Sequence, residues 1–221
     1  MKSYNEQLTA LRASGNLRHL PEVEHQGIWI LKEGMRMLNL SSNDYLGLAS
    51  RQDLQEEFQA STQDRFYPYS SSSSRLLTGN FSVYTKLEKQ IARSFDREAA
   101  LIFNSGYHAN TGILPALTDK QTLLLADKLV HAIIDGILLS GSPFLRYRHN
   151  DYDQLERLVQ KNACQYETII ILTESIFSMD GDVADLNRLI AIKRQYPNIL
   201  LYVDEAHAIG ARGKTGLGIA E

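Results

Sequence analysis

Residues 168–207, TIIILTESIFSMDGDVADLNRLIAIKRQYPNILLYVDEAH, contain the pattern that decides the fold. The run Thr168–Thr173 is apolar almost throughout, which predicts a strand buried on both faces. Helical spacing of apolar residues over Asp185–Tyr196 predicts a helix with Asp185 as its N-cap, and Ile199–Val203 predicts the next strand. A buried strand, a helix and a second buried strand are typical of a parallel sheet with a helical crossover.

The same alternation runs back to about residue 83. A helix is predicted through Val83, Leu87, Ile91 and Phe95, followed by a strand at Ala99–Phe103, a helix at His108–Leu117, a strand at Thr122–Ala126, a helix at Val130–Leu139, a strand at Phe144–Tyr147 and a helix at Asp153–Gln160. The whole pattern predicts an α/β fold with a largely parallel sheet and helices on both faces. Residues 1–50 are expected to form a separate N-terminal arm, with a helix and a hairpin around Glu33-Gly34, and residues 51–221 the large domain.

Composition excludes several classes of protein. The 221 residues are 43% hydrophobic and 22% charged, which is ordinary for a folded chain, and the net charge of −3 disfavours nucleic acid as a partner. The longest apolar runs are too short to span a bilayer, so no membrane association is expected. The single cysteine, Cys164, excludes an internal disulfide and a multi-cysteine metal site. A cytoplasmic enzyme without a metal is the expectation.

Polar residues gather where the predicted strands end, which is where parallel sheets bind ligands. Gly106 and Tyr107 open a helix after Phe103, so their backbone N–H groups suit an anion such as phosphate. Asp204 follows the strand Ile199–Val203, with His207 three residues later. A carboxylate there can hold a protonated ring nitrogen, or it can simply cap a turn.

Two further residues follow neighbouring strands. His131 comes after Thr122–Ala126, where an imidazole can stack on a flat ligand or lie half-buried at a helix start. Ser178 follows Thr168–Thr173 in a turn with Asp180 and Asp182, which is also compatible with a solvated glycine turn. Together these contacts favour a flat, phosphorylated cofactor at one edge of the sheet.

A nucleoside triphosphatase is the competing interpretation. Val203–His207 resembles the magnesium-binding segment of RNA helicases, and residues 208–215 loosely fit a phosphate loop. A phosphate loop leaves its strand at once and opens a helix at its lysine. Here the acidic segment occupies the strand exit, and Gly216 and Gly218 interrupt any helix after Lys214. The order of these motifs disfavours that interpretation.

Five segments, taken in order, give a more specific identification. They are Ser41–Leu48 (SSNDYLGL), Arg75–Gly79 (RLLTG), Phe103–Tyr107 (FNSGY), Ile176–Asp182 (IFSMDGD) and Val203–His207 (VDEAH). The joint pattern resembles the α-oxoamine synthases, which are fold-type I enzymes dependent on pyridoxal phosphate. The resemblance covers essentially the whole chain, as the N-terminal part of such an enzyme.

The resemblance implies a role for each matched residue. Asp204 pairs with the pyridine nitrogen of pyridoxal phosphate and His131 stacks on its ring, so that Asp204, His131 and His207 form the catalytic set. The cofactor contacts are Gly106, Tyr107, His131, Ser178, Asp204 and His207. Arg18 and Asn43 are implied as substrate-binding residues. The Schiff-base lysine and the C-terminal domain of the family are expected beyond Glu221.

The resemblance also implies a reaction. Ser41–Leu48 and Ser74–Asn80 are most similar to the branch of the family that condenses L-alanine with a pimeloyl thioester, on coenzyme A or a carrier protein, in biotin biosynthesis. Glycine C-acetyltransferase, 5-aminolevulinate synthase and serine palmitoyltransferase are the alternatives within the family, and a non-catalytic fragment or subunit is the alternative outside it. A homodimer is expected by analogy, and the 221 residues alone are expected to be inactive.

Overall fold

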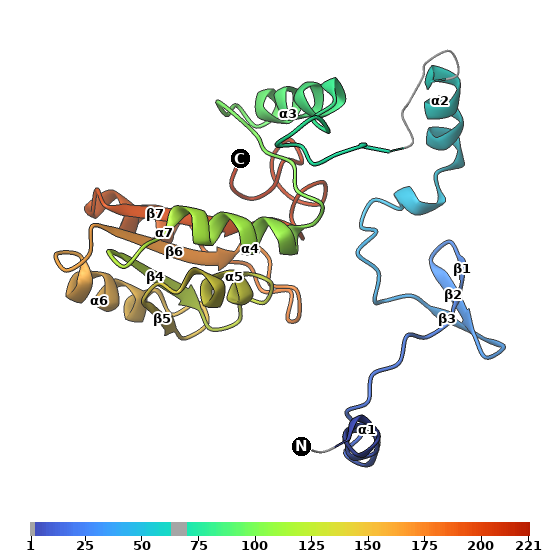
Figure 1. Ribbon diagram of the computed structural model, residues 1–221, viewed down its shortest axis with the longest axis horizontal. Helices are drawn as coiled ribbons and strands as arrows, with labels where there is room; N and C mark the ends of the chain where they lie inside the picture. The colour runs from blue at the N-terminus through green and yellow to red at the C-terminus, as the bar shows by residue number, and fades with distance from the viewer. Residues whose placement is uncertain (1–2, 63–69) are drawn as a thin grey trace. The chain divides into compact units, whose positions relative to one another are not determined.

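The computed structural model describes residues 3–62 and 70–221, which fall into two compact units, Met1–Asp64 and Arg65–Glu221. Figure 1 shows the path of the chain through both units, and each unit is considered by itself. The division predicted from the sequence, an arm of residues 1–50 and a large domain of residues 51–221, stays a prediction.

The first unit contains short elements with little core. Helix α1 (Tyr4–Ala13) begins with a capping box, in which the Ser3 hydroxyl accepts from the Glu6 amide and the Glu6 carboxylate accepts from the Ser3 amide. The other elements are β1 (Glu24–Gln26), β2 (Trp29–Lys32), β3 (Met35–Leu38), the 3-10 turn η1 (Leu48–Ser50) and α2 (Gln52–Thr62). The predicted hairpin is confirmed, because β2 and β3 pair antiparallel around Glu33 and Gly34, both with positive φ.

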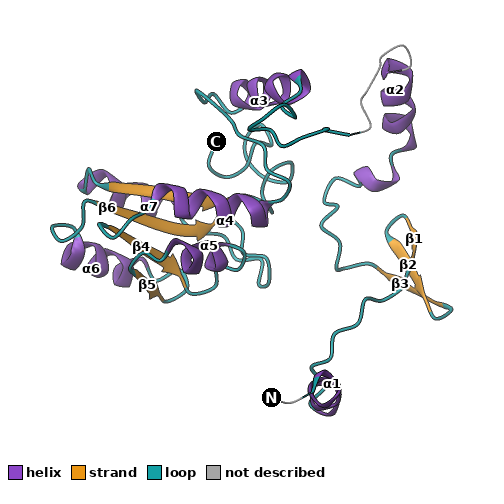
Figure 2. Ribbon diagram, viewed as in Figure 1, coloured by secondary structure: helices purple, strands orange, loops and turns teal. Residues whose placement is uncertain are grey.

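The second unit is a four-stranded parallel sheet between helices. Its elements are α3 (Ser82–Ser94), α4 (Gly106–Leu117), β4 (Thr122–Asp127), α5 (Ile133–Ser140), β5 (Phe144–Tyr147), α6 (Tyr152–Asn162), β6 (Thr168–Glu174), α7 (Leu186–Gln195) and β7 (Ile199–Asp204). The strand order is β5-β4-β6-β7, and all three pairings are parallel. Figure 2 shows the strands in orange between the purple helices. The predicted fold class is confirmed.

The two faces of the sheet carry separate apolar cores. Leu124 and Ile170 pack on one face with residues of α4 and α5, whereas Leu125 and Ile171 pack on the other face with residues of α6 and α7. Successive residues of a strand point to opposite faces, so a strand that is apolar throughout needs cover on both sides. This burial explains why β4 and β6 show no polar alternation. Because the strands pair parallel, the loops after β4, β6 and β7 lie at one edge of the sheet.

The strand predicted at Ala99–Phe103 is wrong. These residues form an irregular segment, and the Leu101 side chain is exposed. Side chains satisfy part of its backbone, since the Ile102 amide donates to Glu88 Oε1 at 3.0 Å and the Ile102 carbonyl accepts from Arg75 Nη1 at 3.1 Å. A strand needs a partner strand for its ladder of hydrogen bonds, and among the described residues none pairs with this segment.

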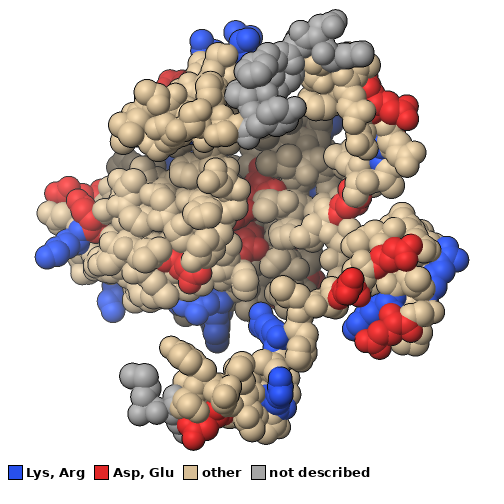
Figure 3. All heavy atoms as spheres, turned by 45° about the vertical axis from the view of Figure 1, so that its right-hand side comes forward, with Lys and Arg blue, Asp and Glu red and all other residues tan. Residues whose placement is uncertain are grey.

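The surface is mixed in charge. On the face shown in Figure 3, Lys and Arg side chains are dispersed among Asp and Glu side chains. In the described part of the chain, no helix has the length and apolar character needed to cross a bilayer.

Candidate active site at the carboxyl edge of the sheet

Three neighbouring strands each end in an acidic residue. Asp127, Glu174 and Asp204 are the last residues of β4, β6 and β7. Glu174 and Asp204 are Cα partners in the register of β6 and β7. We call this side of the sheet, together with the start of α4, the carboxyl edge. It is the place where parallel sheets collect ligands.

Asp204 is partly exposed and held by two donors. Its Oδ1 accepts from the Ala206 amide at 3.0 Å, and its Oδ2 accepts from Asn110 Nδ2 at 3.2 Å. Asn110 lies on α4, is only 2% exposed, and accepts at Oδ1 from the Tyr202 hydroxyl at 2.6 Å. Burial, and secondarily the charge of Asp204, raises the pKa of Tyr202 to about 12, so this hydroxyl remains a donor at neutral pH. The orientation of Asp204 is therefore fixed from α4.

Glu174 connects the two loops that carry His131 and Ser178. Its Oε1 accepts from the His131 amide at 2.7 Å and its Oε2 from the Ser178 amide at 3.3 Å. The side chains of His131 and Ser178 themselves are exposed. The structure thus brings these two predicted residues together through a third residue, Glu174, which the sequence reasoning missed.

The start of α4 offers backbone donors. Ser105 is the N-cap, and its hydroxyl accepts from the His108 amide at 3.1 Å. Within the described part of the chain, the amides of Gly106 and Tyr107 have no acceptor, and a Cβ built on Gly106 would meet nothing within 4 Å. Unpaired N–H groups at the positive end of a helix dipole, with open space before them, fit a phosphate group.

Tyr107 and His131 line one cavity of about 420 Å³, together with Val130, Ala132, Ile134, Asp135 and Arg146. His207 lies in the turn after Asp204 and is partly buried. Arg18 and Asn43 belong to the first unit, where Arg18 is exposed and Asn43 Oδ1 accepts from the Tyr45 hydroxyl at 3.3 Å. Their predicted role in substrate binding stays a prediction.

Asp127 is already occupied by protein donors. This buried carboxylate accepts from the amides of Leu129 and Asn150, and its Oδ1 lies 3.0 Å from His149 Nδ1. His149 Nε2 lies 3.1 Å from Asp182 Oδ2. Burial opposes the charge on His149, but the two carboxylates outweigh it and raise the pKa of this imidazole.

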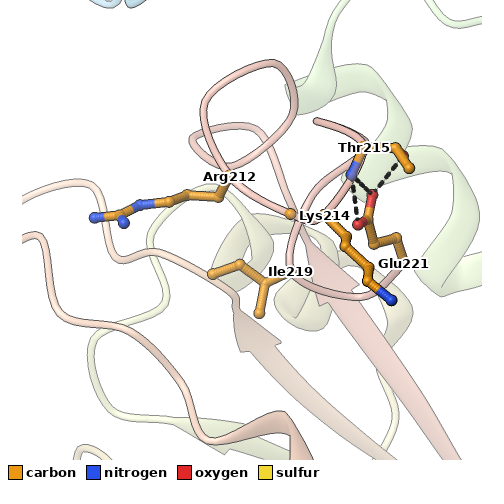
Figure 4. Close-up of a pocket in the computed structure, with 6 residues that line it drawn as sticks. Arg212, Lys214, Thr215, Ile219 and Glu221 are labelled. Carbon is orange, nitrogen blue, oxygen red and sulfur yellow. Dashed lines mark hydrogen bonds between the residues drawn. The ribbon is translucent and has the colours of Figure 1, made fainter.

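The phosphate-loop interpretation fails in the structure as predicted. No helix follows Lys214, and the Glu221 carboxylate accepts from the Thr215 amide at 2.8 Å and from the Thr215 hydroxyl at 2.7 Å (Figure 4). Glu205 Oε1 accepts from the amide of Ile219 at 2.7 Å. Carboxylates therefore occupy amides that a phosphate would need. In the described residues, no group of three His, Cys, Asp or Glu side chains is placed to hold a metal ion.

Comparison with known proteins identifies the family of this chain. Residues 35–220 match the family described as aminotransferase class I and II. A protein of Haemophilus influenzae strain 86-028NP, provisionally named 8-amino-7-oxononanoate synthase, is 58% identical to this chain. The alignment covers 100% of this chain and 58% of the length of that protein. A protein with the same provisional name from Neisseria meningitidis serogroup A is 57% identical over the same share of each chain. The chain thus spans 58% of the length of these curated relatives.

Solved structures show the same fold. The serine palmitoyltransferase of Sphingomonas wittichii matches with a TM-score of 0.82 at 24% identity, over 97% of this chain and 54% of that chain. The 8-amino-7-oxononanoate synthase of Francisella tularensis matches with a TM-score of 0.63 at 30% identity, over 80% of this chain and 48% of that chain. Another serine palmitoyltransferase structure contains pyridoxal phosphate. The expected cofactor, pyridoxal phosphate, is confirmed at the level of the family.

Proposed function

The chain belongs to the aminotransferase class I and II family, and from this premise we propose that it forms the cofactor-binding part of a synthase that condenses L-alanine with a pimeloyl thioester. Carbon dioxide and the thiol leave, and 8-amino-7-oxononanoate is the product. Relatives at 57–58% identity over the whole chain support this choice of reaction. The observation that carries the proposal is the partly exposed Asp204 carboxylate at the end of β7, oriented by Asn110.

The residues of the carboxyl edge have complementary tasks in this proposal. Pyridoxal phosphate, when bound, supplies an electron sink for negative charge at the Cα of the amino acid. Asp204 holds the proton on the ring nitrogen, and His131 lies against the ring and limits its tilt. The remaining contacts are the amides of Gly106 and Tyr107 toward the phosphate, and Ser178 and His207 toward the ring oxygen.

The substrates and the assembly complete the proposal. Arg18 and Asn43 bind substrate, and the thioester is carried on coenzyme A or on a carrier protein. The enzyme acts as a homodimer in the cytoplasm. None of the lysines of this chain occupies the sequence context of the lysine that anchors the cofactor in the family, so we expect the 221 residues alone to be inactive.

The test compares Asp204→Asn with Asp153→Asn, which alters an exposed carboxylate on α6 that binds Arg188. Product formation from L-alanine and pimeloyl-CoA is measured by mass spectrometry in the protein that contains the anchoring lysine. We expect Asp204→Asn to lower kcat by about 100-fold or more, since a preorganised charge at the reacting centre is lost, and Asp153→Asn to leave it unchanged.

Two outcomes would contradict the proposal. One is a turnover of Asp204→Asn equal to that of the wild type. The other is preference for glycine or serine, or for another acyl thioester, in a panel of substrates, which would assign a different α-oxoamine synthase. Product made by the pure 221-residue chain would overturn the expectation of inactivity.

A further inference from the structure

Glu174 is a buried acidic residue without a cationic partner among the described residues. Glu174 is only 6% exposed. In the described ranges, no Lys, Arg or His forms an ion pair with it. Burying a carboxylate carries a cost in desolvation free energy, and an apolar side chain at the same position would avoid this cost. The position of Glu174 therefore calls for an explanation beyond packing.

The two hydrogen bonds of Glu174 join loops from different strands. The His131 amide, 2.7 Å from Oε1, precedes α5 and follows β4, whereas the Ser178 amide, 3.3 Å from Oε2, lies in the turn after β6. No side chain of its own caps α5, because its N-cap is Ala132. A carboxylate is an acceptor at both oxygens, so one side chain can receive both amides at once.

The turn that carries Ser178 is itself a closed unit. The Phe177 amide donates to the Asp182 carbonyl at 2.9 Å, the Gly181 amide donates to the Phe177 carbonyl at 2.9 Å, and Ile176 and Val183 form an antiparallel bridge. These contacts hold the turn together, and the hydrogen bond from the Ser178 amide to Glu174 anchors it to the end of β6. Glu174 is also the Cα partner of Asp204 in the register of the sheet.

We propose that Glu174 is a positioning residue, which sets the spacing between His131 after β4 and Ser178 after β6, next to Asp204 at the end of β7. This inference rests on the proposed function for the meaning of His131 and Ser178 as cofactor contacts. Glu174 does not touch the ring. It acts through the backbone of the two loops, because each of its carboxylate oxygens accepts one loop amide.

The first test is hydrogen exchange at individual amides, followed by NMR in the cofactor-free protein. Glu174→Gln keeps the volume but retains one acceptor oxygen, so we expect the amide with the longer bond, Ser178, to exchange at least about tenfold faster, while His131 stays protected. In Glu174→Ala both amides should exchange at least about tenfold faster, the factor that corresponds to about 1.4 kcal/mol.

The matched control is Glu88→Gln, because Glu88 also accepts a backbone amide, that of Ile102, but lies on α3. Its substitution should leave the His131 and Ser178 amides protected, because it alters no acceptor of either amide. Equal acceleration of core amides such as that of Ile170 would show a merely structural role for Glu174 and overturn the proposal. So would unchanged protection of both amides. If the alanine variant does not fold, the near-isosteric glutamine variant decides alone.

The second test is the affinity for pyridoxal phosphate, measured by calorimetry. Glu174→Ala, or Glu174→Gln if the alanine variant does not fold, should bind the cofactor about tenfold more weakly than Glu88→Gln. This factor again corresponds to about 1.4 kcal/mol of binding free energy. Equal affinity of these variants would overturn the positioning role. Failure of the wild type to bind pyridoxal phosphate would instead refute the proposed function, and the exchange experiment would still decide whether Glu174 fixes the two loops.

Discussion

The hydrogen-bond chain from Tyr202 through Asn110 to Asp204 predicts a measurable coupling between its members. Asn110→Ala removes the acceptor of the Tyr202 hydroxyl at 2.6 Å and the donor to Asp204 at 3.2 Å. Tyr202→Phe removes only the first of these bonds. If the chain acts as a unit, the second substitution should have little left to remove once Asn110 is gone.

The magnitudes follow from the types of bond. A neutral hydrogen bond contributes about 1 kcal/mol and one to a charged group about 2 kcal/mol. Asn110→Ala should therefore lower the free energy of unfolding by about 3 kcal/mol, and Tyr202→Phe by about 1 kcal/mol. In the Asn110→Ala background, Tyr202→Phe should cost close to nothing, which gives a coupling energy of about 1 kcal/mol.

Urea unfolding of the four proteins of this cycle, followed by circular dichroism, measures the coupling. Tyr152→Phe is the control, because the Tyr152 hydroxyl also makes hydrogen bonds, but to residues other than Asn110: it donates to Asn150 Oδ1 at 2.8 Å and accepts from the Asp185 amide at 2.6 Å. Its effect should add to that of Asn110→Ala. Additivity of Tyr202→Phe with Asn110→Ala would refute the idea that Asn110 transmits order from Tyr202 to Asp204.

Two further predictions concern packing and pH. Gly136→Ala should lower the free energy of unfolding in urea by about 2 kcal/mol, because its Cβ would overlap the Asn110 carbonyl. The Cβ of Gly112→Ala would meet only the edge of the Phe103 ring at 3.3 Å, so this control should cost less. Equal losses for the two variants would contradict the close approach of α4 and α5. Because the folded pKa of His149 is raised, its charged form stabilises the fold below the ordinary pKa of 6.5, and this stability is lost as the pH rises through the raised value. His149→Gln should remove that part of the pH dependence of unfolding, and an unchanged profile would argue against the two carboxylate contacts.

The core of the second unit could be predicted because burial on two faces leaves a strong sequence pattern. Thr122–Ala126 and Thr168–Thr173 are each one residue short of the observed strands, and Asp185 is the N-cap that was predicted. Segments whose structure depends on a distant partner could not be predicted in the same way. Ala99–Phe103 has the composition of a strand, but strand formation requires a neighbour, and Leu101 remains exposed.

The residues around the candidate site were predicted unevenly for a related reason. Asp204 and His131 were predicted as site residues because they follow apolar strands, and that prediction stays a prediction. Glu174 carried the same signal, as the residue directly after Thr168–Thr173. Asn110 carried no such signal, since it lies in the middle of a helix, where an amide side chain is usually exposed. Its contact with Asp204 joins residues 94 positions apart in the chain. Only the packing of α4 across the sheet reveals it.

The three acids of the carboxyl edge differ in their exposure to solvent, and this difference distinguishes Asp204. Asp127 is fully buried and receives two amides and His149. Glu174 is buried, and each of its oxygens receives a backbone amide. Asp204 receives one donor at each oxygen but remains partly exposed, and a carboxylate has room for about four donors. Asp204 therefore offers a charge that is oriented by the protein and still accessible, which is what the proposed function requires for a cationic ring nitrogen.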